Sequence, residues 1–202
     1  MSKSLNNFFT VRDVAEQYGY EPIRYFLISS SYRSPINYNT EIIEQGIAAL
    51  DRLYNCRGGL AFTLKNAGDA AGAGDEEMRR LLKERREQFI AAMDDDLNTA
   101  DAIAAVFELA RDINVQLAPA NAPSRAVCEE ALQVFDELTG VLGLLYARKD
   151  EVLDSDIEAL IQARAEARQT KNWAEADRIR DELKALNIIL EDTPQGVKWH
   201  RG

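Results

Sequence analysis

The stretch NTADAIAAVFELARDINVQL, residues 98–117, repeats its apolar side chains at three- and four-residue steps. These apolar positions are Ile103, Val106, Phe107, Ala110, Ile113 and Leu117. The spacing places them on one face of an α-helix, and such a face is normally buried. Asn98 is a good N-cap, with Asp101 three residues later as a shorter capping-box partner. The stretch therefore predicts a core-facing helix.

The neighbouring sequence repeats this pattern. Residues 124–145 carry apolar side chains at almost heptad spacing, and residues 40–65 form a long amphipathic segment. Asp75 is expected to cap a further, charged helix after a flexible Gly/Ala connection at 66–74. We therefore predict a mainly α protein with an antiparallel helical bundle of three or four helices at 40–147.

Shorter elements flank the predicted bundle. Residues 1–39 hold two short predicted helices and a loop rich in turn formers and tyrosine. Residues 148–154 are predicted to be a charged linker. Within residues 155–202 the spacing of apolar residues changes from a helical to a strand pattern. It predicts two helices joined by a short turn, followed by two strands joined by a Pro/Gly turn. This last segment predicts a small α+β module, a helical hairpin plus a β-hairpin, with Trp199 in its core.

The charge of the chain argues against general nucleic-acid binding, because a net charge of −10 repels phosphate. The charge is unevenly distributed. Residues 1–154 carry 16 basic and 25 acidic side chains, whereas residues 155–202 carry 8 and 9. The last quarter is therefore suited to a local site that recognises its ligand by specific contacts.

The composition of the chain argues against several other classes of protein. The chain has no apolar run near the roughly 18 residues of a membrane span, and its N-terminus does not resemble a signal peptide. Cys56 and Cys128 lie far apart without metal-ligand spacing, which favours a reducing cytoplasm and predicts no metal site. His200 is the only histidine and lies near the end, which argues against Ser-His-Asp or Cys-His catalysis.

The opening residues MSKS, 1–4, suit a loop that closes over phosphate. Lys3 supplies a point charge, and the flanking serines supply hydroxyls for phosphate oxygens. The pattern is short, and a solvated lysine near a terminus is its more common explanation when it is taken alone.

The residues that follow MSKS make the interpretation of this loop more specific. MSKSLNNFFTVRDV at 1–14 resembles the KMSKS loop and the following SLGNFFTVRDV of the cysteinyl-tRNA synthetases. These class I enzymes activate cysteine with ATP and load it onto its tRNA. The first lysine of the motif would precede Met1, and Asn6 stands where the family usually has glycine.

The resemblance implies a nucleotide-binding role for the loop. The implied ATP-binding residues are Met1, Ser2, Lys3 and Ser4. In the class I reaction the loop lysine stabilises charge as pyrophosphate leaves. The family's catalytic domain and zinc site lie upstream of this loop, so we expect a C-terminal part in which Lys3 is idle.

A second resemblance lies in the tail. ARQTKNWAEADRIRDEL at 167–183 and ILEDTPQGVKW at 189–199 resemble the anticodon-binding tail of the same family. Unpaired bases are read by stacking and by hydrogen bonds to their edges. The implied anticodon-binding residues are Arg168, Trp173, Asp177, Arg180 and Asp192. The alternatives are that Trp173 is a core residue and that Asp177 and Arg180 form only an exposed ion pair.

Arg24 and Arg33 fall in a stretch that resembles the family's stem-contact region, which joins the catalytic domain to the helices. They are predicted to contact tRNA backbone. Pairing with the abundant carboxylates is an equally weighted alternative.

These resemblances cover essentially the whole chain and imply a function. We expect the C-terminal part of a cysteine–tRNA ligase, which binds tRNA-Cys and its anticodon but does not aminoacylate alone. ATP and zinc are expected in the full enzyme and not on this chain. We further expect a catalytic domain as partner, no membrane association, and a cytoplasmic monomer.

Two other interpretations are possible. The cysteine ligases of mycothiol synthesis share the loop and the bundle but lack the anticodon tail, so residues 164–201 argue against them. A non-enzymatic acidic helical adaptor would explain the net charge and the bundle pattern, and would have no specific affinity for RNA.

Overall fold

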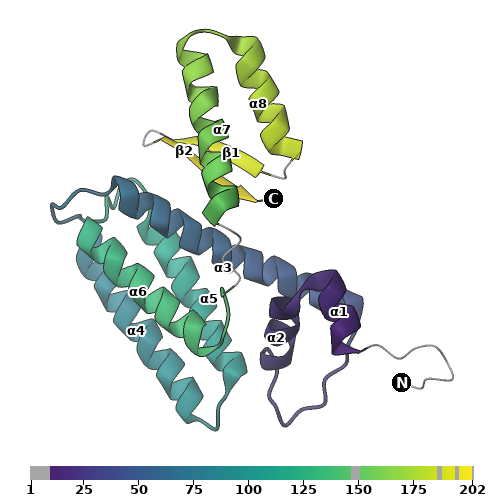
Figure 1. Cartoon of the computed structure of the whole chain (residues 1–202). Helices are drawn as coiled ribbons and strands as arrows, with labels where there is room; N and C mark the ends of the chain where they lie inside the picture. The colour runs from purple at the N-terminus through teal and green to yellow at the C-terminus, as the bar shows by residue number, and fades with distance from the viewer. Residues whose placement is uncertain (1–9, 147–150, 186–187, 194–195, 202) are drawn as a thin grey trace. The chain divides into compact units, whose positions relative to one another are not determined.

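The computed structural model describes residues 10–146, 151–185, 188–193 and 196–201, and it confirms the prediction of a mainly helical protein (Figure 1). The chain divides into two compact units, Met1–Tyr146 and Ala147–Gly202, which we call the N-terminal unit and the C-terminal unit. No helix in the described part of the chain is both long and apolar enough to cross a bilayer.

The described part of the N-terminal unit contains six helices. They are α1 (Val11–Tyr18), α2 (Tyr20–Ile28), α3 (Thr40–Asn66), α4 (Asp75–Asp94), α5 (Thr99–Gln116) and α6 (Arg125–Val141). Gly19 separates α1 from α2 at a φ of 81°, a conformation that suits glycine. Helix α2 packs on α3, and α4, α5 and α6 pack on one another, with α5 and α6 also against α3 (Figure 1).

Local capping and a shared core explain these helices. Asn98 accepts a hydrogen bond from the Asp101 N–H at 3.2 Å, and Ser124 accepts one from the Val127 N–H at 3.4 Å. The apolar face predicted for α5 is buried, apart from the half-buried Phe107 and Leu117 at its edges. Fully buried side chains from four helices meet in this core: Leu53, Leu60, Met78, Leu109, Ile113, Val127 and Phe135.

Asp75 does not cap α4 as predicted. The helix begins at Asp75 itself, and Gly74 in the cap position makes no side-chain cap hydrogen bond. The buried Asp75 carboxylate instead accepts hydrogen bonds from the N–H groups of Ser124 at 2.9 Å and Gly72 at 3.1 Å. It therefore ties the start of α4 to the start of α6.

The connection before α4, predicted to be flexible, makes hydrogen bonds that the sequence does not suggest. The Gly68 carbonyl accepts a hydrogen bond from the Arg125 N–H at 2.8 Å, and the Gly74 N–H donates to the Asn121 carbonyl at 3.1 Å. These partners lie about fifty residues downstream in the sequence, where local composition gives no sign of them. The connection is therefore tied to the segment before α6 at two points.

The described part of the C-terminal unit contains α7 (Glu151–Gln169), α8 (Trp173–Ala185), β1 (Ile188–Thr193) and β2 (Gly196–Arg201). Helix α7 begins at Glu151, so residues 151–154 of the expected linker are helical. The strands pair antiparallel, with Leu190 opposite Trp199. Ile157, Ile179, Leu183 and Ile188 form the buried core, and Trp199 packs against it as predicted.

Candidate nucleic-acid interface

The turn between α7 and α8 fixes the start of the second helix. The Asn172 N–H donates to the Ala167 carbonyl at 2.8 Å, and the Lys171 N–H donates to the Arg168 carbonyl at 3.1 Å. This paired closure is a Schellman motif, in which Lys171 occupies the left-handed position with a φ of 57°. Asn172 then caps α8 by accepting a hydrogen bond from the Glu175 N–H at 3.4 Å. Trp173 therefore follows directly from a hydrogen-bonded turn.

Trp173 is the first residue of α8, and it is 59% exposed. The alternative in which Trp173 belongs to the core is therefore wrong. Trp199 supplies the aromatic side chain of that core instead. An exposed indole that starts a helix presents a large flat surface to solvent, which is the geometry that base stacking requires.

Asp177 and Arg180 are exposed on the same helix, four and seven residues after Trp173. The closest approach of the Arg180 guanidinium to Asp177 is 3.6 Å, and to Asp181 it is 3.8 Å. Both distances exceed hydrogen-bond length, so these are loose ion pairs between exposed groups. The guanidinium donors and the carboxylate acceptors keep their capacity to bind a polar ligand.

Arg178 provides a contrast on the same helix. Its guanidinium lies 2.6 Å from Glu175 and 3.2 Å from Glu182. The hydrogen bond and the charge of Glu175, with a smaller contribution from Glu182, raise the pKa of Arg178 above its ordinary value. Arg178 is thus engaged within its own helix, whereas Arg180 is only loosely held.

The other two predicted anticodon residues belong to neighbouring elements of the same unit. Arg168 is exposed in the last turn of α7, directly before the turn that leads to Trp173. Asp192 lies inside β1, with Val197 as its partner in the register, although its side chain is outside what the structure describes. The predicted ATP-binding residues Met1, Ser2, Lys3 and Ser4 also lie outside the described residues.

The two predicted backbone-contact residues differ in their surroundings. Arg33 forms an ion pair with Asp96 at 2.6 Å and a hydrogen bond with the Tyr32 hydroxyl at 3.0 Å. The guanidinium of Arg24 instead lies against Gly143, where an added Cβ would be 2.9 Å from its Nη1 atom. Among the described residues Arg24 has no carboxylate partner. The pairing alternative therefore applies to Arg33 and not to Arg24.

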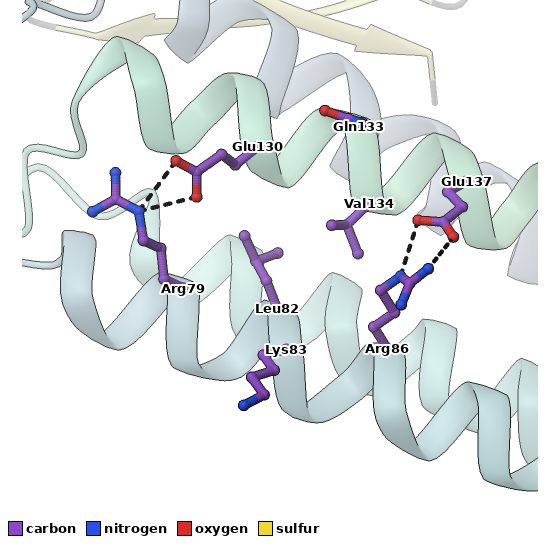
Figure 2. Close-up of a pocket in the computed structure, with 8 residues that line it drawn as sticks. All are labelled: Arg79, Leu82, Lys83, Arg86, Glu130, Gln133, Val134 and Glu137. Atoms are coloured by element: carbon purple, nitrogen blue, oxygen red, sulfur yellow. Dashed lines mark hydrogen bonds and ion pairs between the residues drawn. The ribbon is translucent and has the colours of Figure 1, made fainter.

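A groove of about 430 Å³ lies between α4 and α6. Figure 2 shows the residues that line it. Arg79 binds Glu130 at 3.0 Å, and seven residues later on both helices Arg86 binds Glu137 at 2.7 Å. The apolar side chains of Leu82 and Val134 lie between the two pairs (Figure 2). Both arginines form ion pairs with carboxylates of the facing helix. These pairs join α4 to α6, so the two arginines do not form a phosphate site.

Comparison with known families assigns the regions just described. The family model of the DALR domain matches residues 88–146. That of the cysteinyl-tRNA ligase anticodon binding domain matches residues 150–199, which include the whole exposed face of α8. That of the class I (C) tRNA synthetase catalytic domain matches residues 1–48. The chain belongs to the cysteinyl-tRNA synthetase family.

Curated relatives named cysteine–tRNA ligase agree with this assignment. The chain is 48% identical to the protein of Symbiobacterium thermophilum over 203 residues and 46% identical to that of Clostridioides difficile over 202 residues. It is 48% identical to that of Anoxybacillus flavithermus over 202 residues. Each alignment covers 100% of this chain and 43% of the relative. The chain therefore spans less than half the length of the curated relatives it matches.

The cysteinyl-tRNA synthetase family implies zinc and ATP, and the described residues do not fit a zinc site. In residues 10–146 and the described parts of the tail, no three His, Cys, Asp or Glu side chains gather as metal ligands. Cys56 is buried and donates to the Ala110 carbonyl at 3.5 Å. Burial raises the pKa of the Cys128 thiol, which keeps it protonated at neutral pH.

Three features of this chain were not predicted from its sequence. The left-handed conformation of Lys171 has no glycine to signal it. Asp96, which holds Arg33, lies in a run of three aspartates of which any could have been the partner. Arg52 stacks on Phe107 across two helices, and a contact at that sequence separation has no local signal.

Proposed function

We propose that this chain is the tRNA-binding part of a cysteine–tRNA ligase, and that its C-terminal unit binds the anticodon of tRNA-Cys. The observation that carries the proposal is the exposed face of Trp173, Asp177 and Arg180, within a segment that matches the anticodon binding domain. Trp173 stacks on a base, while the carboxylate and guanidinium bind base edges. Arg168 and Asp192 complete this site from the neighbouring elements.

The finer organisation belongs to the same proposal. Residues 1–39 hold the ATP loop and the stem-contact region, and residues 40–147 form an antiparallel helical bundle. Residues 148–154 connect it to the anticodon-binding domain, 155–202, a helical hairpin plus a β-hairpin. The pairing of β1 with β2 and the packing of α7 on α8 support the last assignment.

Aminoacylation requires more than these residues. We propose that a preceding catalytic domain holds ATP and zinc, and that Lys3 acts there in closing the loop of residues 1–4 over the phosphates. Arg24 contacts tRNA backbone, and Arg33 does so only if Asp96 releases it. The chain acts as a cytoplasmic monomer and forms no ester bond to tRNA by itself.

The test is binding of the whole chain to tRNA-Cys at physiological salt, compared with a transcript that differs only in its GCA anticodon. We expect tighter binding to the native transcript. Trp173→Ala should weaken that binding roughly fivefold or more, because a stacked base contributes about 1–3 kcal/mol. Ile189→Ala is the matched control, since Ile189 is also apolar and exposed in the same unit.

A second pair of variants tests the polar contacts. Arg180→Ala should reduce discrimination between the two transcripts, whereas Arg178→Ala should not, because Arg178 is engaged by Glu175 and Glu182. Equal and weak binding of both transcripts by the unaltered chain would contradict the proposal. That result would favour the acidic adaptor, which has no specific affinity for RNA.

A further inference from the structure

Most arginines of the N-terminal unit are neutralised by carboxylates. The paired arginines are Arg33, Arg57, Arg79, Arg80, Arg85, Arg86, Arg111 and Arg125. Arg12 lies near Asp13 and contributes to lowering the pKa of that carboxyl, after the larger effect of Thr10. Within residues 10–146, Arg12, Arg24 and Arg52 have no ion pair, and of these Arg24 and Arg52 lie against uncharged groups. This is unexpected where acidic side chains outnumber basic ones, 25 to 16, over residues 1–154.

Arg52 is held in place by an aromatic ring instead of an anion. Its guanidinium carbon lies 4.8 Å from the centroid of the Phe107 ring, which is a cation–π contact. Phe107 in turn meets Tyr25 edge-on, with the centroids 6.5 Å apart and the rings at 86°. A ring provides no hydrogen-bond acceptor of carboxylate strength, so the N–H donors of Arg52 keep their capacity to bind an anion.

Arg24 lies beside backbone and not beside a carboxylate. Its guanidinium lies against Gly143, whose φ of 65° allows the close approach. The buried Glu21 carboxylate keeps this segment in place, because it accepts hydrogen bonds from the Leu145 N–H and the Tyr54 hydroxyl. Tyr25, the residue after Arg24, contacts Phe107, and Phe107 contacts Arg52.

We propose that Arg52, together with Arg24, forms a second RNA contact on the N-terminal unit, in which the two guanidiniums bind phosphates of the tRNA backbone. The inference rests on the proposed function, since it takes tRNA as the partner. Guanidinium forks match phosphate oxygens bidentately, and both are pre-positioned by uncharged groups that leave their donors free. Phosphate contacts position the RNA and carry no sequence information.

The experiment measures affinity of the whole chain for native and anticodon-altered tRNA-Cys over a range of salt concentrations. Arg52→Gln should weaken binding to both transcripts by the same factor. It should also lower the slope of log Kd against log salt by about one, the contribution of one lost phosphate contact. Arg24→Gln should do the same, and the double variant should lower the slope by about two. Arg52→Lys, which keeps the charge, should retain most of the slope.

Arg80→Gln is the matched control, because Arg80 is exposed in the same unit but bound by Glu77 and Glu84. It should leave the slope unchanged. Equal slopes for Arg52→Gln, Arg24→Gln and this control would overturn the inference, and so would a loss limited to the native anticodon. Either result leaves the proposed anticodon binding standing if the unaltered chain still discriminates between the transcripts. If the unaltered chain binds no tRNA, the proposed function and this inference both fail.

Discussion

Asp75 shows how one carboxylate connects distant parts of the N-terminal unit. It is 4% exposed, and its two oxygens accept hydrogen bonds from backbone donors of Ser124 and Gly72. Burial alone would raise the pKa of Asp75, but the hydrogen bonds from Ser124 and Gly72 outweigh burial and lower this pKa below its ordinary value. The charged carboxylate therefore stabilises the folded state, because folding favours the deprotonated form.

Asp75→Asn should lower the free energy of unfolding by about 1–3 kcal/mol at pH 7. The amide can accept from Ser124, but its NH2 group cannot accept from Gly72. Because the folded pKa is depressed, the wild-type advantage is complete above the unfolded pKa of about 3.9 and declines as pH falls below it. Urea unfolding, followed by the circular dichroism of the helices at pH 7 and pH 3, measures the stability difference between the two proteins and its change with pH. An equal difference between the two proteins at both pH values would contradict the role of the charge.

The candidate site was predictable at single residues only where the signal is local. Helical spacing is sufficient to place Trp173, Asp177 and Arg180 together, and the structure has all three exposed on α8. The loose contact of Arg180 and the tight pairing of Arg178 were not predictable, because both arginines have carboxylates at helical spacing. Side-chain geometry decides between them.

At the scale of elements, the connection 67–74 marks the limit of local reasoning. The caps by Asn98 and Ser124 follow from sequence alone, because each cap bonds to a residue three positions later. The glycines before α4 lead any prediction from local sequence to expect a flexible connection. Their order comes from backbone groups near the start of α6, which sequence composition does not connect with them.

Gly72→Ala tests this connection. The new Cβ would lie 2.1 Å from the Ala122 carbonyl oxygen, and backbone cannot swing aside as a side chain can. We expect a loss of about 1–3 kcal/mol in the free energy of unfolding. Gly68→Ala is the matched control, since no atom lies within 4 Å of its added Cβ. Similar stabilities of the two variants would show that the connection yields to the extra methyl group.

At the scale of the whole molecule, the chain holds two cores of unequal size. The N-terminal unit buries side chains from four long helices, including Leu109 and Phe135. The C-terminal unit has four buried residues in its core, packed by a few half-buried ones. A small core gives a small free energy of unfolding, so we expect the C-terminal unit to be less stable than the N-terminal unit.

Amide hydrogen exchange should resolve this difference. Amides of α5 and α6 near Leu109 and Phe135 should exchange most slowly, through global unfolding of their unit. Amides in the β1–β2 pairing, such as those of Glu191 and Lys198, should exchange with a lower opening free energy. Convergence of all these amides on one opening free energy would contradict two separate cores.

The two tryptophans of this chain differ in surroundings in a way that is of practical use. Trp173 lies in solvent at the proposed anticodon site, and Trp199 packs against the core of the same unit. Both tryptophans belong to the C-terminal unit, whereas all seven tyrosines lie before residue 147. Tryptophan emission therefore originates only in the C-terminal unit, and a base stacked on Trp173 would quench one emitter while the other stays constant. Trp173 would thus report occupancy of the proposed site without a label, with Trp199 as an internal reference.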